Sequence, residues 1–341
     1  MTGQTQMRRE VTEIPDAVER LLSGGAQAVR AAATEIARRD PAFFVTVARG
    51  SSDHACSYLK YAAELLCGLP VASVGPSVAS IYKAPLRMAG GVCVSVSQSG
   101  QSPDIVDLTR AARTGGAYSI AVTNDAASPL AKAADVTLDI HAGPERSVAA
   151  TKTFVTSALA CLWVVAELAG DDALLAAIRA LPESLARAAA SDWGALAGAA
   201  GRGSLYTLGR GPSWAISNEA ALKFKEVCQL HAESYSSAEV LHGPVSIVDA
   251  GFPVLAFTAR DAAEDAVVQV ADALAAKGAA VFVTSDRVTC AQALPTVRTG
   301  HWLTDPLALI VSFYATIEAL AVARGLNPDT PRHLSKVTST T

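Results

Sequence analysis

Apolar residues along the chain fall in short runs that alternate with longer segments of mixed character. The runs are rich in Val, Ile, Phe and Thr and are bounded by glycine, which predicts β-strands at residues 43–48, 91–96 and 117–123. The segments between and after them predict helices at residues 53–66, 104–114 and 152–168. Because nearly continuous apolar strands are typical of parallel sheets covered on both faces, we expect an α/β fold with a mostly parallel sheet flanked by helices on both sides.

The second half of the chain repeats this scheme. Residues 45–52 resemble residues 206–213, since each has an apolar strand, then Arg-Gly, then a serine that opens a helix. Two further pairs match in the same order, which predicts two copies of one α/β unit: 91–96 with 251–257, and 117–123 with 279–284. Gly201-Arg202-Gly203 is expected to begin the second copy. We expect a tail with a lead-in helix, a first domain, an alanine-rich linker, a second domain and a C-terminal tail at residues 1–28, 29–180, 181–200, 201–325 and 326–341.

Composition narrows the classes of partner. The 341 residues carry a net charge of −4 and only 18% are charged, so general binding to nucleic acid or to an anionic membrane is not expected. The uncharged stretch 306–317 is shorter than the about 20 residues that a membrane span needs, and it predicts a buried core or dimer helix. No signal sequence opens the chain, and we expect a cytoplasmic protein. The cysteines form no C-x-x-C pair and are expected to be buried thiols in a reducing compartment: Cys56, Cys67, Cys93, Cys161, Cys228 and Cys290.

A cluster of small hydroxyl residues lies between a strand and a helix at residues 95–104. Backbone N–H groups and the helix dipole at a helix N-terminus attract anions, and hydroxyl groups add donors. The alternative is a polar turn in which Ser102 or Asp104 caps the helix. The matching segment of the second half, 257–263, lacks the serines, which favours a functional loop and one anion site per chain. Its candidate donors are Ser97, Gln98, Ser99 and Ser102, with Ser52 at the same sheet edge.

A second group of candidate residues is acid–base in character. Glu219, Lys223 and Glu226 fall at positions i, i+4 and i+7 of a predicted helix and therefore share a face. They form either a solvated row of ion pairs or a general base, Glu226, with a cation beside it. His242 precedes Gly-Pro, which predicts a loop position where histidine is either a proton shuttle or structural. Lys336 lies in a terminal tail that is either frayed or folded over a site.

Several motifs in the same order resemble two sugar isomerase (SIS) domains, as in the isomerase half of glucosamine-6-phosphate synthase. The resemblance runs from about Met7 to Lys336 and rests on Ser97-Gln98-Ser99-Gly100, Ala149-Ala150-Thr151-Lys152, Ala221-Leu222-Lys223-Phe224-Lys225-Glu226, His231-Ala232-Glu233, His242-Gly243-Pro244 and Pro331-Arg332-His333-Leu334-Ser335-Lys336. It implies two tandem SIS-type domains that bind an amino sugar phosphate or fructose 6-phosphate without a metal or an organic cofactor.

The resemblance also implies a role for each candidate. Glu226 matches the base that moves a proton between C1 and C2, and Lys223 the lysine beside it. His242 matches a ring-opening histidine supplied by the partner subunit, which implies a homodimer. Lys336 matches a lysine that closes over the open-chain sugar. The sugar-phosphate contacts fall on Ser52, Ser97, Gln98, Ser99, Ser102 and the backbone of Val148.

Two departures from the synthase pattern refine the expected reaction. The tandem begins after a short tail with Thr2 at position 2, so ammonia release from glutamine by a catalytic N-terminal cysteine is not expected. Arg49-Gly50-Ser51-Ser52 and the segment with Ala150 look more like SIS-type glucosamine-6-phosphate deaminases, which implies conversion of glucosamine 6-phosphate to fructose 6-phosphate and ammonia. The alternatives are an isomerase or deaminase of another amino sugar phosphate, in either direction, and a non-catalytic sugar-phosphate sensor.

Overall fold

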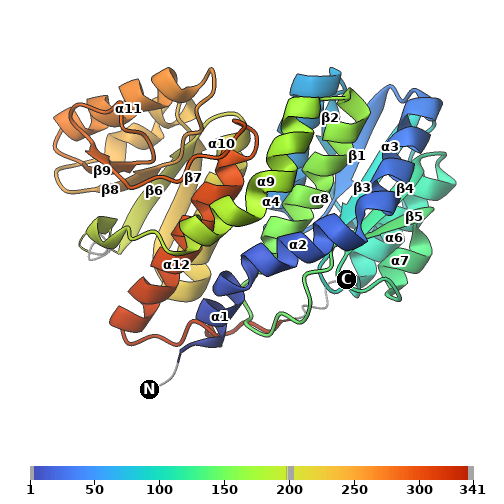
Figure 1. Cartoon of the computed structure of the whole chain (residues 1–341), viewed down its shortest axis with the longest axis horizontal. Coiled ribbons are helices and arrows are strands. Elements are labelled where there is room, and N and C mark those ends of the chain that lie inside the picture. Colours follow the sequence, from blue (N-terminus) through green and yellow to red (C-terminus); the bar gives the residue numbers. More distant parts are fainter. Residues whose placement is uncertain (1–3, 197, 199–202, 337–341) are drawn as a thin grey trace. The chain divides into compact units, whose positions relative to one another are not determined.

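Two parallel five-stranded sheets organise the chain (Figure 1). The structure is a computed structural model that describes residues 4–196, 198 and 203–336. It divides the chain into two compact units, each with one sheet. The first-sheet unit consists of Glu13–Glu145, Lys152–Arg179 and the chain from Leu334, and the second-sheet unit consists of the chain up to Thr12, Arg146–Thr151 and Ala180–His333.

The first sheet has the strand order β2-β1-β3-β4-β5, and every pairing between neighbours is parallel. Its strands are β1 (Phe43–Val47), β2 (Val71–Ser73), β3 (Gly91–Val96), β4 (Tyr118–Thr123) and β5 (Val136–Asp139). After β1 the chain continues to its neighbour β2 at one edge of the sheet, whereas after β3 it continues through β4 to β5 at the other edge. The order in which strands are added to the sheet therefore reverses between β1 and β3. This is the topological switch point at which open parallel sheets bind ligands, beyond the carboxyl ends of the strands.

Helices cover both faces of the first sheet. Right-handed crossovers place α4 (Ser51–Cys67) and α6 (Pro103–Thr114) on opposite faces. On one face, α4 packs on α8 (Lys152–Ala169), and α8 also contacts α2 (Ile14–Gly24) and α3 (Ala26–Arg39). On the other side, α6 packs against α5 (Ser77–Ser80) and α7 (Pro129–Ala133).

The second sheet repeats this topology with the order β10-β9-β8-β6-β7. Its strands are β6 (Ser204–Gly209), β7 (His231–Ser236), β8 (Pro253–Ala256), β9 (Ala280–Val283) and β10 (Gln292–Ala293). Gly50 before α4 and Gly211 before α10 (Pro212–Cys228) share an unusual backbone conformation, with φ/ψ of 55°/−135° and 59°/−139°. The predicted duplication is therefore confirmed, as is the α/β class with parallel sheets.

The remaining elements connect and cover the second sheet. Its unit holds α1 (Gln6–Thr12), α11 (Glu264–Ala276), α12 (Asp305–Ala323) and the 3-10 helices η2 (Glu239–Leu241) and η3 (Pro244–Ile247). The predicted linker contains the end of α9 (Asp172–Ala189), which carries the chain from one unit into the other. The predicted boundary at Gly201-Arg202, Thr2 and the tail beyond Lys336 lie outside the described residues.

Two helices of the described chain, α8 and α12, are long and apolar enough to cross a membrane. However, 83% and 78% of their apolar windows are buried inside the protein, as in the core helices of a globular protein. The stretch 306–317 is thus part of a buried core helix, which confirms that alternative of the prediction.

The expectation that all six cysteines are buried is wrong for Cys290. This residue is exposed, in the polar loop that precedes β10, and Cys67 is half-buried. The others are buried, and burial raises the pKa of the Cys93 thiol to about 11 and that of Cys161 to about 12.

Candidate active site

The serine loop, residues 97–102, follows β3 at the switch point of the first sheet. The Ser97 hydroxyl accepts a hydrogen bond from the Gly100 N–H at 3.2 Å, and the Ser99 hydroxyl accepts one from the Gln101 N–H at 3.3 Å. These two backbone donors are thus used within the loop. A serine hydroxyl can accept and donate at once, so each keeps its own hydrogen for an external acceptor. The loop therefore offers the Ser97 and Ser99 hydroxyls, and not these two N–H groups, as donors to a ligand.

Gly100 allows the loop to turn back on itself. Its φ of 61° lies in the left-handed region, and an added Cβ would come within 2.2 Å of the Ser128 hydroxyl oxygen. Its carbonyl also accepts a hydrogen bond from the Leu130 N–H at 3.1 Å. The loop conformation therefore requires glycine at this position.

The two capping alternatives for α6 resolve in favour of Asp104. Its Oδ1 accepts the Ile105 N–H at 2.9 Å, and the carboxylate is fully buried. Ser102 occupies the N-cap position, but within the part of the chain that the structure describes its side chain forms no capping hydrogen bond. The other Asp104 oxygen, Oδ2, lies 2.6 Å from Nε of Arg49, which follows β1. The Ser102 hydroxyl is therefore not consumed by capping.

Ser52 lies in the first turn of α4, on the other side of the switch point. The helix begins at Ser51, two residues earlier than the pattern predicts. Ser52, Gln98, Ser99 and Ser102 are partly exposed, whereas Ser97 is 8% exposed. The structure thus places the five predicted sugar-phosphate side chains on loops and helix ends at one sheet edge.

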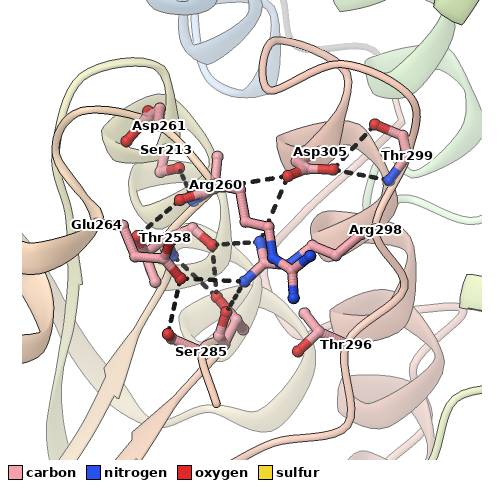
Figure 2. A network of polar contacts seen from close by, with 12 residues as sticks. Ser213, Thr258, Arg260, Asp261, Glu264, Ser285, Thr296, Arg298, Thr299 and Asp305 are labelled. Carbon is pink, nitrogen blue, oxygen red and sulfur yellow. Dashed lines mark hydrogen bonds and ion pairs between the residues drawn. The ribbon is translucent and has the colours of Figure 1, made fainter. Parts of the chain in front are cut away.

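In the second sheet, the corresponding edge is occupied by the protein's own side chains (Figure 2). By strand register, Thr258 takes the place of Ser97. Figure 2 shows the Arg298 guanidinium at the centre, where Nη1 donates to the Thr258 carbonyl at 2.9 Å and Nη2 to the Thr284 carbonyl at 2.7 Å. The carboxylates of Glu264 and Asp305 lie 3.6 and 3.5 Å from it. The second copy thus holds an internal guanidinium where the first copy has its serine loop.

The acid–base cluster on α10 is buried, which excludes the solvated row of ion pairs. Glu219 and Lys223 have no exposed side-chain surface, and the Glu226 side chain is 20% exposed. The Lys223 ammonium contacts Oε2 of Glu226 and lies 3.2 Å from Oε1 of Glu219, which also accepts the Tyr314 hydroxyl at 3.0 Å. Burial lowers the Lys223 pKa, but the two carboxylates outweigh it and raise this pKa to about 12. Lys223 is therefore a fixed cation, and Glu226 is the member of the cluster that solvent can reach.

His242 lies on a loop, as predicted. It follows η2, donates its N–H to the Glu239 carbonyl at 2.9 Å, and is exposed. Leu241 beside it is 49% exposed and Ile247 is 56% exposed. The imidazole is thus accessible on a partly apolar surface.

Val148 belongs to the segment Arg146–Thr151, which joins the second-sheet unit. The buried Glu10 carboxylate accepts the N–H groups of Arg146 and Ser147. The Val148 N–H donates to the Asp329 carbonyl at 3.2 Å. The backbone contact to substrate expected at Val148 is thus left to its carbonyl oxygen.

Lys336 is held in the first-sheet unit by an ion pair. Its ammonium lies 2.7 Å from Oε2 of Glu145, whose side chain is fully buried. Glu145 also accepts the N–H and the hydroxyl of Thr153 at the start of α8, at 3.1 and 2.6 Å. The described part of the C-terminal tail is therefore anchored at this lysine.

The sequence itself matches a known family twice. A model of the SIS domain fits residues 42–167 and, again, residues 200–323. The chain belongs to the SIS domain family. In this tandem, the serine loop, Ser52 and Lys336 lie in the first-sheet unit, and Glu226, Lys223, His242 and Val148 lie in the second-sheet unit.

Similar proteins extend over the SIS tandem. The chain is 37% identical over 315 residues to the isomerizing glutamine–fructose-6-phosphate aminotransferase of Aeropyrum pernix, covering 85% of this chain and 50% of the relative. It spans about half the length of the curated relatives it matches. A solved structure named "putative phosphosugar isomerase from Silicibacter pomeroyi DSS-3" is 64% identical, with a TM-score of 0.93 and coverage of 96% of this chain and 100% of that one. Glucosamine-6-phosphate deaminase from Thermotoga maritima, 18% identical, shares the fold with a TM-score of 0.80 and coverage of 98% and 100%.

Sequence reasoning missed the partners of the candidate residues in this SIS tandem. Glu145, the carboxylate that holds Lys336, is separated from it by 191 positions. Tyr314, which donates to Glu219, lies in the buried helix α12 with no motif of its own. The one available signal was the Arg-Gly that follows the first strand in both halves, which marked Arg49 without giving it a partner.

Proposed function

We propose that the chain is an amino sugar phosphate isomerase acting as a glucosamine-6-phosphate deaminase. The observation that carries this proposal is the buried Glu219–Lys223–Glu226 cluster, in which one carboxylate, Glu226, reaches solvent beside a fixed ammonium. Proton transfer between adjacent carbons needs a general base, and a carboxylate that solvent can reach is able to serve as one. Arg49-Gly50-Ser51-Ser52 and Ala150 support a deaminase over a synthase-like isomerase, through their resemblance to deaminase motifs.

The serine loop is proposed to hold the phosphate group of the substrate. The hydroxyls of Ser97, Ser99 and Ser102, the Gln98 amide and Ser52 supply neutral donors at the N-termini of two helices. Fixing the phosphate restrains C1 and C2 of the bound sugar, which lowers the entropic part of the barrier.

Ring opening and proton transfer follow. His242, contributed by the partner subunit of a homodimer, helps to open the pyranose to the aldehyde. Glu226 removes the C2 proton to give an enolamine, and a proton returned at C1 leaves an imine at C2 and a CH₂OH group at C1. Water then adds to the imine carbon and ammonia leaves, which yields fructose 6-phosphate.

Two ammonium groups stabilise the negative charge that develops during these reaction steps. Lys223 stays charged beside Glu226 and orients that carboxylate. Lys336, anchored by Glu145, is proposed to close over the open-chain sugar, where the Val148 carbonyl supplies a further contact. The tail thus acts as the closing element of the site.

The test is Glu226→Gln. This change removes the base but keeps the shape of the side chain, so we expect turnover of glucosamine 6-phosphate to fall by about 10²–10⁴-fold while its binding persists. Glu183→Gln, at an exposed position of α9, is the matched control and should leave turnover unchanged. A Glu226→Gln enzyme with a near-wild-type rate refutes the assignment of the base.

A further inference from the structure

The serine loop contains no cationic side chain that could balance the charge of a bound phosphate group. A phosphate ester carries a charge of about −1.5 to −2 near neutral pH. Residues 97–103 include neither Lys nor Arg, and the next residue, Asp104, places a fully buried carboxylate in the first turn of α6. An anion that binds at this helix N-terminus meets a buried negative charge behind it, which opposes the favourable helix dipole.

Arg49 supplies a positive charge next to this loop. It follows β1, and its Nε approaches Oδ2 of Asp104, in the helix after β3, to 2.6 Å. The ion pair therefore bridges the two loops that flank the switch point. Its Nε is engaged by Asp104, yet 49% of the Arg49 side chain stays exposed. A guanidinium has five N–H donors in a planar fork, so its Nη groups suit phosphate oxygens.

At the corresponding edge of the second sheet, a guanidinium is used within the protein. There Arg298 is 16% exposed, and its Nη groups donate to two carbonyls and face two carboxylates. Ser213, the counterpart of Ser52, accepts the Ala259 N–H at 3.2 Å. The Arg298 guanidinium uses its donors on the protein, whereas half of the Arg49 side chain stays exposed beside Asp104.

We propose that Arg49 is a further substrate-binding residue that contacts the phosphate group of the sugar phosphate, with Asp104 as the positioning residue that holds its guanidinium at the loop. This inference rests on the proposed function for the identity of the ligand.

The experiment compares Arg49→Ala with Arg113→Ala. Arg113 lies at the other end of α6, is 50% exposed, and pairs through Nε with Asp135 at 2.7 Å, so it matches Arg49 in charge, exposure and contact. Calorimetry with glucosamine 6-phosphate and with inorganic phosphate should show at least tenfold weaker binding for Arg49→Ala than for wild type. This difference in affinity should become smaller at high salt, because salt screens the charge of the guanidinium. Arg113→Ala should bind both ligands as wild type does. In turnover, KM should rise and kcat should change less than threefold. Equal affinity of Arg49→Ala and wild type overturns the proposal.

Two further variants separate contact from neutralisation of Asp104. Arg49→Ala leaves a buried carboxylate unpaired, which weakens folding, so the double variant Arg49→Ala with Asp104→Asn removes both charges. If Arg49 contacts phosphate, the double variant stays at least tenfold weaker than wild type, and Arg49→Lys recovers part of the affinity. A double variant that binds like wild type overturns the contact.

The proposed function fails separately from this inference. If wild-type protein binds phosphate through Arg49 but turns over no amino sugar phosphate, the enzymatic assignment falls and the Arg49 contact stands. If wild-type protein binds neither inorganic phosphate nor glucosamine 6-phosphate, both fall.

Discussion

At the residue scale, burial and the neighbouring carboxylates act in opposite directions on the pKa of Lys223 and together set its charge. Burial opposes an ammonium, yet Glu219 and Glu226 together raise its pKa to about 12, above the usual value of 10.5. A raised pKa means that the stabilisation is complete below about pH 10 and is lost only as pH rises through 12. Lys223 therefore remains charged at neutral pH, which leaves Glu226 as the proposed base.

The variant Lys223→Met tests this buried cluster. Removing the ammonium leaves the Glu219 carboxylate buried with no cation at 3.2 Å, so we expect a loss of about 3–5 kcal/mol in the free energy of unfolding. Urea denaturation at neutral pH measures it. Lys225→Met, an exposed neighbour on the same helix, should change this free energy by less than about 0.5 kcal/mol. A loss below about 1 kcal/mol for Lys223→Met contradicts the account of the cluster.

At the element scale, the strand–loop–helix unit at β3 and α6 carries the candidate site. The loop is held from inside by hydrogen bonds of Ser97 and Ser99 to its own backbone, and its turn depends on Gly100. The loop is thus organised before any ligand arrives, which lowers the entropy cost of binding.

Gly100→Ala should disable this loop. The new Cβ would meet the Ser128 side chain at 2.2 and 2.5 Å in a left-handed backbone conformation, so the turn must shift. We expect loss of inorganic phosphate binding in calorimetry, with folding retained by circular dichroism. Gly90→Ala has a similar positive φ of 77° but nothing within 4 Å of the new Cβ, and it should bind phosphate normally. Unchanged affinity in Gly100→Ala means that the loop does not hold the phosphate.

At the scale of the whole molecule, duplication followed by divergence explains why one half carries the serine loop. Both sheets have the same order and the same glycine turn after the first strand, so the second edge could have served the same purpose. Arg298 now occupies it with its own hydrogen bonds. The candidate acid–base residues lie instead on α10 of the second half.

The pattern of the sequence predicted the central strands and their helices well, because these segments are buried on both faces. It missed β2, β5, β7 and β10, since short strands and edge strands carry few apolar residues. The candidate residues were found through motifs on single elements. Their partners, such as Glu145 for Lys336 and Asp104 for Arg49, were not, because only the folded chain joins positions so far apart in sequence.

The most direct test of the account is a turnover assay on the wild-type protein. Ammonia and fructose 6-phosphate should both be released from glucosamine 6-phosphate in equal amounts, with galactosamine 6-phosphate and with fructose 6-phosphate plus glutamine run in parallel. Release of both products from glucosamine 6-phosphate is the predicted result. Tight binding of an amino sugar phosphate without any turnover contradicts the enzymatic account and favours a sugar-phosphate sensor.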